Sequence, residues 1–235
     1  MIRRLSLPLL SLLLAASLLA VPAHAGKSKV PRGKTWRVDF RSDTLGIAPT
    51  GSIVMAGSWA VLEDSSAAAA TGGADGGSAD SARALPRVLR QRSDDEAVAS
   101  NWIRFAKPTL ETCEISVRFR ILSGELDPSV GIVFHFDPKR KNGYLVRISG
   151  RTEEMIAHYL LSGKRRDIKF QKMTPPALGE WHTLGVRREG IRISVLYDGK
   201  EMMALREERF ASGTVGLWTE DDTVADFADL TITAR

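Results

Sequence analysis

The stretch GEWHTLGVRREGIRISVLYDGK, residues 179–200, decides the fold of this chain. Apolar side chains occupy alternate positions on both sides of Glu189-Gly190, and Asp198-Gly199 follows the second run. Alternation with a period of two between glycine-containing turns is the pattern of a β-hairpin. We therefore predict two antiparallel strands whose shared apolar face is formed by Leu184, Val186, Ile193, Val195 and Tyr197.

The same alternation recurs along the rest of the chain, most clearly in residues 113–121. Many short strands between turns, with no convincing amphipathic helix, indicate an all-β sandwich of two antiparallel sheets. A jelly roll is an arrangement of this kind that protects exposed sheet edges. Further strands are predicted at residues 36–40, 53–62 (a hairpin), 85–91, 101–105, 130–136, 143–148, 155–161, 168–170, 201–205, 215–219 and 227–233.

The first 25 residues have the pattern of an export signal. Arg3 and Arg4 precede an apolar run, and Ala23-His24-Ala25 is a cleavage site of the small-x-small type. An uncleaved membrane anchor is the alternative, although the run is short for a span of ~20 residues. We predict export to the periplasm or outside a bacterial cell, with no membrane span in residues 26–235.

The remaining length suits one large β domain. We interpret residues 26–35 as a flexible lead-in and residues 36–235 as the jelly-roll domain. Within it, residues 64–83 are rich in alanine, glycine and serine and carry too little large apolar side chain to pack. This segment is therefore predicted to be an exposed loop insertion and not a boundary between domains.

Basic residues gather at two places, residues 139–141 and 164–166, both beside predicted turns. The formal net charge is +5, and loss of the two arginines of the signal would leave +3. Together the two basic clusters favour an anionic surface or polysaccharide as a partner. Ordinary solvated loops are the alternative, and export argues against nucleic acid.

Cys113 is the only cysteine, so no disulfide can form within the chain. It begins a predicted strand on the apolar side, and no basic partner that would activate a thiol is evident. We therefore predict a buried, unreactive thiol.

The pattern Trp-His-x-Leu-x-Val-x-Arg, then Ile-x-Val-x-x-Asp-Gly, in residues 181–199 resembles the central hairpin of concanavalin A-like jelly rolls. These include the laminin G-like and family 16 glycosidase-like domains. Residues 57–64, 129–136, 143–148 and 213–232 resemble successive strands of one such family, the 3-keto-disaccharide hydrolase-like domain of unknown function. The resemblance covers about residues 36–235. It implies the jelly-roll fold but no single activity, because relatives include enzymes, lectins and proteins without a known ligand.

The active-site strand of family 16 glycosidases is not matched. That chemistry needs Glu-x-Asp-x-x-Glu, because alternation then points three carboxylates into one cleft. Glu125-Leu126-Asp127 begins the pattern, but Val130 stands where the last glutamate belongs and Pro128 interrupts the strand. Family 16 chemistry is therefore not expected.

Strand parity predicts a polar groove on one outward sheet face, provided that the strands neighbour each other as in the jelly-roll relatives. An aromatic ring stacks on the apolar face of a sugar, while arginine, histidine and carboxylate groups bond to its hydroxyls. An ordinary solvated face with a half-buried Trp218 is the alternative, and an error of one residue in register would reverse every assignment. The predicted ligand-binding residues are Arg118, His135, Arg147, His158, Trp218 and Glu220.

The jelly-roll resemblance also implies a structural calcium ion near the first and last strands. Asp39, Asp226 and Asp229 would supply carboxylate oxygens, together with backbone carbonyls. The chain has no EF-hand spacing, and aspartates placed like Asp226 and Asp229 more often cap turns. No other cofactor is implied.

Three functions follow from this sequence. The leading hypothesis is a carbohydrate-binding jelly roll. The second is a glycoside hydrolase of the 3-keto-disaccharide type, with His135, His158 and Glu220 as acid and base groups. The third is a structural or adhesion module that recognises protein through its basic loops. The identity of the glycan and the oligomeric state stay open.

Overall fold

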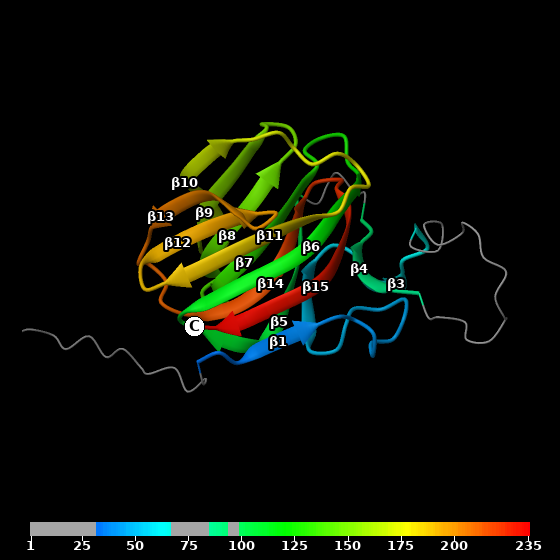
Figure 1. Cartoon of the computed structure of the whole chain (residues 1–235), viewed down its shortest axis with the longest axis horizontal. Helices are drawn as coiled ribbons and strands as arrows, with labels where there is room; N and C mark the ends of the chain where they lie inside the picture. Colours follow the sequence, from blue (N-terminus) through cyan, green and yellow to red (C-terminus); the bar gives the residue numbers. More distant parts are fainter. Residues whose placement is uncertain (1–31, 67–84, 94–98) are drawn as a thin grey trace, which may run out of the picture.

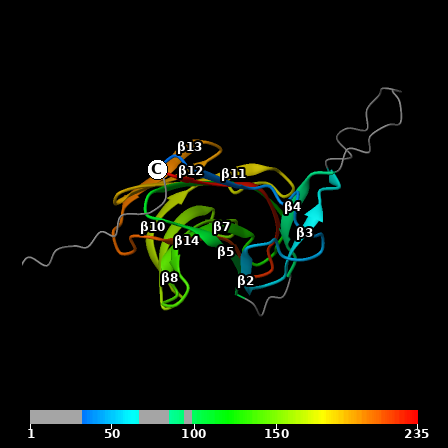
Figure 2. The ribbon, with the colours of Figure 1, turned by 90° about the horizontal axis from the view of Figure 1, so that it is seen from below.

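The chain folds into two antiparallel β-sheets stacked face to face (Figures 1 and 2). The computed structural model describes residues 32–66, 85–93 and 99–235. The predicted all-β, two-sheet jelly-roll sandwich is confirmed.

The first sheet, sheet A, has eight strands and the second, sheet B, has seven. Sheet A runs in the order β13 (Lys200–Arg206), β12 (Arg192–Tyr197), β11 (His182–Glu189), β6 (Cys113–Ser123), β15 (Val224–Ala234), β4 (Arg87–Gln91) and β3 (Trp59–Glu63), with β1 (Thr35–Val38) also paired to β15. Sheet B runs in the order β10 (Lys164–Lys172), β9 (Glu154–Leu161), β8 (Asn142–Ser149), β7 (Ser129–Asp137), β14 (Gly213–Glu220), β5 (Ser100–Leu110) and β2 (Ser52–Ala56).

The predicted hairpin is confirmed as β11 and β12. Leu184 pairs with Tyr197 and Glu189 pairs with Arg192, so the turn falls at Gly190 and Ile191. Gly190 has a φ of 58°, a conformation that glycine adopts at no steric cost. The hairpin lies beside β6 in sheet A, since Leu184 also pairs with Val117.

The hydrophobic core lies between the two sheets and is built from alternate residues of each strand. Val117 and Phe119 of sheet A and Ile132 and Phe134 of sheet B are at most 1% exposed. Full burial of one such side chain stabilises the fold by about 1.5–3 kcal/mol. Because side chains alternate, the residues between these core positions lie on the outer faces of the sheets.

The hairpin predicted at residues 53–62 is wrong. Its two strands belong to different sheets, because β2 pairs with β5 and β3 pairs with β4. The chain crosses between the sheets at Gly57, whose φ is +82°. A Cβ atom at Gly57 would lie 2.4 Å from Asn101 Oδ1, so a side chain would collide with β5 at this crossing. Trp59 and Val61 point into the core, as alternation predicted.

Several predictions concern residues outside the described part of the chain. The export signal, residues 26–31 of the lead-in and residues 67–83 of the low-complexity insertion all lie there. The strands on either side of the insertion, β3 and β4, pair with each other, and the Asp64 amide donates to the Pro86 carbonyl at 2.7 Å. Across the described residues, no helix has the length and apolar character required to cross a membrane.

Candidate functional site

The outer face of sheet B is strongly concave. Arg165 on the edge strand β10 donates two hydrogen bonds to Glu220 on β14, and Arg165 Nη2 lies 2.7 Å from Glu220 Oε1. Three strands separate β10 from β14. In a flat sheet these strands would lie about 19 Å apart, which is further than the two side chains can span. Sheet B therefore curls toward its own outer face, and Figure 2 shows it arching beneath sheet A.

The floor of this concave face is aromatic. Trp218 of β14 lies directly opposite Trp102 of β5 in the strand register. The ring of Phe136 meets Trp102 edge-on, with 4.8 Å between centroids and an interplanar angle of 89°. These rings belong to a small apolar cluster, separate from the main core, that also contains Val133, Leu145 and Leu160.

A hollow of about 140 Å³ lies over this floor. Trp218 is almost fully buried beneath it, whereas Trp102 is half-buried and presents part of its ring to solvent. The lining residues are Ser100, Trp102, Val133, Phe136, Lys141, Leu145, Leu160, Gly163, Arg165 and Trp218.

Two arginines extend over the Trp218 ring. The guanidinium carbons of Arg165 and Arg147 lie 5.2 and 5.8 Å from its centroid. Contacts of this kind attract the cation to the electron-rich face of the indole. The arginines thereby cover Trp218 and present charge beside the aromatic floor.

Asp127 fixes the position of Arg147. Arg147 Nη1 donates to Asp127 Oδ2 at 2.8 Å, and the Ser129 and Ser149 hydroxyls donate to Asp127 Oδ1 at 2.8 Å each. Burial alone would raise the pKa of Asp127. The hydrogen bonds from Ser149 and Ser129 and the charge of Arg147 outweigh it, so the pKa lies below its ordinary value.

His158 is an uncharged residue beside Arg147. Burial, followed by the charge of Arg147, lowers the pKa of His158 to about 4, although Asp167 opposes the shift. Arg147 Nε donates to His158 Nε2 at 3.3 Å, so Nδ1 carries the proton and donates to Asp167 Oδ1 at 2.8 Å. Both ring nitrogens are therefore engaged.

Glu220 faces the two arginines from the other side. Burial raises the pKa of Glu220, and the hydrogen bonds and charge of Arg165 oppose that shift. Both carboxylate oxygens accept from Arg165, and Arg147 Nη1 lies 3.5 Å from Oε2. Because the acidic and basic groups already pair with one another, the cluster forms a preorganised polar wall and not a free acid–base pair.

The structure brings together four of the six predicted ligand-binding residues. Arg147, His158, Trp218 and Glu220 share the concave face of sheet B, as strand parity predicted. The other two, Arg118 and His135, lie elsewhere.

His135 does not face the groove. A β-bulge interrupts β7 at this point, and His135 has a φ of 49°. The bulge turns the ring inward, where Nε2 lies 3.9 Å from Cys113 Sγ and Nδ1 lies 3.0 Å from the Phe210 carbonyl. Phe136 takes the outward position instead. His135, His158 and Glu220 therefore do not meet around one sugar as the hydrolase hypothesis required.

Arg118 lies on the other sheet. Its strand β6 pairs with β11 and β15, so the expectation that it neighbours the groove strands is wrong. Arg118 Nη1 donates to Asp229 Oδ2 at 3.0 Å, and its guanidinium carbon lies 4.7 Å from the Trp181 ring centroid.

The residues proposed for calcium do not fit a metal site as they are placed. Asp226 is fully buried, and Arg90 and Arg120 occupy both of its oxygens at 2.6–2.9 Å. Asp229 pairs with Arg118, and Asp39 accepts from the Arg41 amide at 3.2 Å. In the described residues no three histidine, cysteine, aspartate or glutamate side chains gather so as to hold a metal ion.

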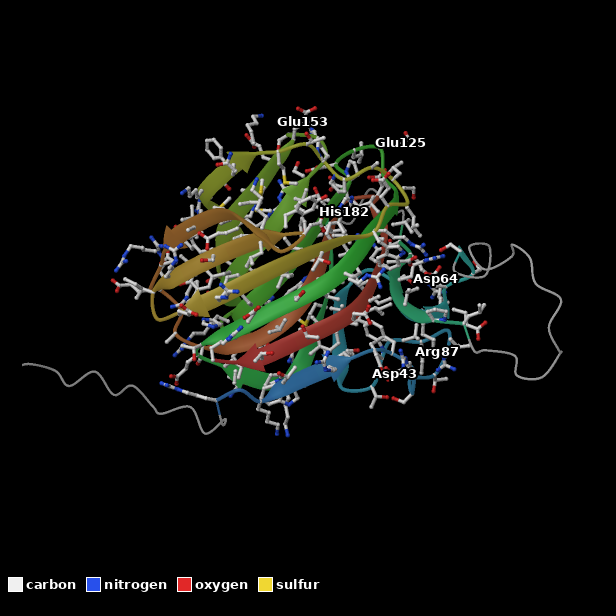
Figure 3. The ribbon with its side chains drawn as sticks, viewed as in Figure 1. Asp43, Asp64, Arg87, Glu125, Glu153 and His182 are labelled. Carbon is white, nitrogen blue, oxygen red and sulfur yellow. The ribbon has the colours of Figure 1, made fainter. Side chains whose placement is uncertain are left out.

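Two larger hollows lie away from the aromatic floor. One, of about 470 Å³, lies on the outer face of sheet A among Arg118, Arg120 and Trp181, close to the Asp43, Asp64 and Arg87 side chains labelled in Figure 3. Arg118 and Arg120 both lie 4.7 Å from the Trp181 ring centroid and so occupy the surface that a ligand would stack on.

The other, of about 630 Å³, lies between β10 and the end of β13. Its aromatic ring, Tyr159, is covered by Arg209 at 4.5 Å, and Arg209 itself pairs with Glu207. Neither larger hollow offers an uncovered aromatic face, so the concave face of sheet B is the stronger candidate.

The sequence matches no known protein family, and no curated protein is significantly similar to it. Solved structures do share its fold. They include the carbohydrate-binding module CBM66 from Bacillus subtilis, at 20% identity and a TM-score of 0.60, covering 79% of this chain and 96% of that one. The apo Crh5 transglycosylase has 13% identity and a TM-score of 0.53, covering 85% of this chain and 84% of that one.

A third similar structure is the exoplasmic/lumenal domain of VIP36 in its Ca²⁺/Man3GlcNAc-bound form. It has 12% identity and a TM-score of 0.51, covering 65% of this chain and 80% of that one. At such identities these likenesses show that the chain has the jelly-roll fold shared by carbohydrate-binding modules, lectins and glycan-active enzymes, and they show the fold alone.

Proposed function

We propose that this protein binds carbohydrate on the concave outer face of sheet B. The observation that carries the proposal is the pair of facing tryptophans, Trp102 and Trp218, beneath a hollow walled by Arg165 and Lys141. A partly exposed indole such as that of Trp102 can stack on the apolar face of a sugar ring, and guanidinium and ammonium groups donate to its hydroxyls. The proposal includes the predicted export, which would bring the protein to extracellular or periplasmic glycans.

The small volume of the hollow indicates how much of a glycan could enter it. Its volume of about 140 Å³ is below the about 300–1,000 Å³ of pockets that enclose a drug-sized ligand. We infer that one sugar unit enters the hollow and that the rest of the ligand lies along the rim.

The structural neighbours are consistent with this function. One is a carbohydrate-binding module, and another was solved with Man3GlcNAc bound. The hydrolase alternative is weaker, because His135 lies between the sheets and Glu220 is held by Arg165. Recognition of a protein partner is the outcome to expect if folded protein binds no glycan.

A glycan array followed by titration of the best ligand tests the proposal. Trp102→Ala is the sharpest variant, because Trp102 is half-buried, whereas Trp218→Ala would open a cavity and cost about 3–5 kcal/mol of stability. We expect Trp102→Ala to weaken binding by about tenfold or more, since truncating a tryptophan that anchors a ligand typically costs about 2 kcal/mol or more. Trp181→Ala, on the outer face of sheet A, is the matched control and should bind normally. If Trp102→Ala bound glycan normally and Trp181→Ala lost glycan binding, the binding site would lie on the outer face of sheet A instead.

A further inference from the structure

Two basic turns that are distant in the sequence meet at one end of the concave face. The turn between β7 and β8 carries Lys139, Arg140 and Lys141, and the start of β10 carries Lys164, Arg165 and Arg166. The Gly163 amide donates to the Lys141 carbonyl at 2.8 Å, and the Ser162 amide donates to Asn142 Oδ1 at 2.8 Å. These hydrogen bonds join the two turns into one basic rim.

Most of the charge on this rim is uncompensated. Arg140 pairs with Asp137 at 3.6 Å, and Arg165 pairs with Glu220. Across the described chain, no carboxylate forms an ion pair with the four remaining cations, which are exposed: Lys139, Lys141, Lys164 and Arg166. A ligand that brought negative charge to this rim would therefore meet cations that are not already held in ion pairs.

The rim is continuous with the aromatic hollow. Lys141, Gly163 and Arg165 line the same hollow as Trp102 and Trp218. A ligand seated on Trp102 thus has the Lys141 ammonium group at its edge, beside the Arg165 guanidinium that pairs with Glu220. Neutral sugars use only the hydroxyl-bonding capacity of such groups, whereas a carboxylate or sulfate uses their charge as well.

We propose that the ligand of this site is an acidic glycan, whose sugar ring lies on Trp102 and whose carboxylate or sulfate groups face Lys141 at the basic rim. This inference rests on the proposed function and specifies its ligand class. An anionic lipid surface would meet the same cations but would leave the narrow aromatic hollow unused.

The test measures binding of the purified protein to matched charged and neutral polymers. The probes are polygalacturonate against its fully methyl-esterified form, and dextran sulfate against dextran, which separate carboxylate from sulfate recognition. Vesicles of phosphatidylcholine and phosphatidylglycerol in a 7:3 ratio test whether the basic rim binds an anionic lipid surface instead. We expect at least one acidic polymer to bind more tightly than its neutral partner, with an affinity that falls as salt rises from 50 to 500 mM, because salt screens exposed charges.

Two double variants locate the effect. Lys139→Gln with Lys141→Gln removes two exposed charges from the rim turn that borders the hollow, and Lys34→Gln with Lys200→Gln removes two exposed charges elsewhere. The first variant should weaken binding of the acidic polymer about twofold to thirtyfold, since up to two exposed ion pairs are lost. The second should bind like the unmodified chain, and Trp102→Ala should also bind the acidic polymer more weakly.

The outcomes separate this inference from the proposed function. Equal binding of charged and neutral polymers, lost in Trp102→Ala, would overturn the acidic specificity and leave the carbohydrate site intact. Binding of every polyanion and of the vesicles, unaffected by Trp102→Ala, would overturn both. Failure of the folded protein to bind any glycan would remove the proposed function itself.

Discussion

Arg165 and Glu220 join the two sides of the concave face across three intervening strands, with Arg165 Nη2 2.7 Å from Glu220 Oε1. The pair does more than neutralise charge. It holds the edge strand β10 over the aromatic floor and covers Trp218. This bidentate contact therefore bridges the curved sheet and helps to fix the position of β10 beside the site.

Replacing Arg165 with alanine should weaken both the fold and the site. Loss of one partner from a buried ion pair costs about 3–5 kcal/mol. The Arg165 side chain is 32% exposed, so solvent screening reduces the expected loss to about 1–3 kcal/mol. Urea unfolding measures this change. The neighbouring Arg166→Ala, which removes an exposed arginine from the same strand, should change stability by less than about 0.5 kcal/mol. Equal effects of the two substitutions would show that the Arg165–Glu220 contact does not hold the edge strand.

The Asp226 cluster should be the strongest electrostatic contributor to stability on sheet A. Asp226 is fully buried between Arg90 and Arg120. Asp226→Asn removes the charge that pairs with both arginines and leaves Arg120 with Asp64 alone, and we expect a loss of about 3–5 kcal/mol in the free energy of unfolding. Asp229→Asn, which breaks the exposed pair with Arg118, should cost less than about 1 kcal/mol. A small effect of Asp226→Asn in urea unfolding would contradict the paired arrangement described here.

Stability should fall on mild acidification because of two buried histidines. Burial lowers the pKa of His135 to about 4, although its hydrogen bond to Phe210 opposes the shift, and burial together with Arg147 lowers that of His158 to about 4. The folded state therefore favours neutral imidazoles. Their contribution is fully present above the ordinary pKa of about 6.5 and is lost as pH falls toward about 4, by up to about 3 kcal/mol for each histidine.

The free energy of unfolding measured from pH 7 to pH 4 checks this prediction. In His158→Gln and in His135→Gln, the free energy of unfolding should decrease less between pH 7 and pH 4 than in the unmodified chain, whatever the stability of each variant at pH 7. A decline of unchanged slope in both variants would assign the pH dependence to other groups.

Cys113 should be unreactive in the folded protein. Burial raises the pKa of its thiol to about 12, despite the nearby charge of Arg188, and the side chain is 1% exposed. Reaction requires both the thiolate and access to it. Labelling with a thiol reagent at pH 8 should proceed only when urea unfolds the chain. Rapid labelling of folded protein would indicate that the sheets open near Cys113 and His135.

Regular strands allowed much of the site to be predicted from sequence. Arg147, His158, Trp218 and Glu220 lie on unbroken parts of their strands, so alternation placed them correctly on one face. The same rule would have found Trp102, because Ile103 and Phe105 point into the core and Trp102 must then point outward.

Other features depended on contacts that alternation does not encode. The bulge at His135 reverses parity at one residue, and no glycine or proline in the sequence marks it. Arg118 was misplaced because sheet membership depends on which distant strands pair, here β6 with β11 and β15. Strand β10 is longer than predicted, since its basic residues lack the apolar alternation that signals a strand. The sequence therefore predicted Arg165 as part of a basic turn and not as a residue of the sheet groove.

The most direct test of the carbohydrate site is NMR of the five tryptophan indole N–H groups during titration with the best glycan ligand. Binding on the concave face should shift the signals of Trp102 and Trp218 together as ligand concentration rises, while those of Trp36, Trp59 and Trp181 stay in place. Shifts confined to Trp181, with Trp102 unchanged at saturation, would contradict a binding site on the concave face of sheet B.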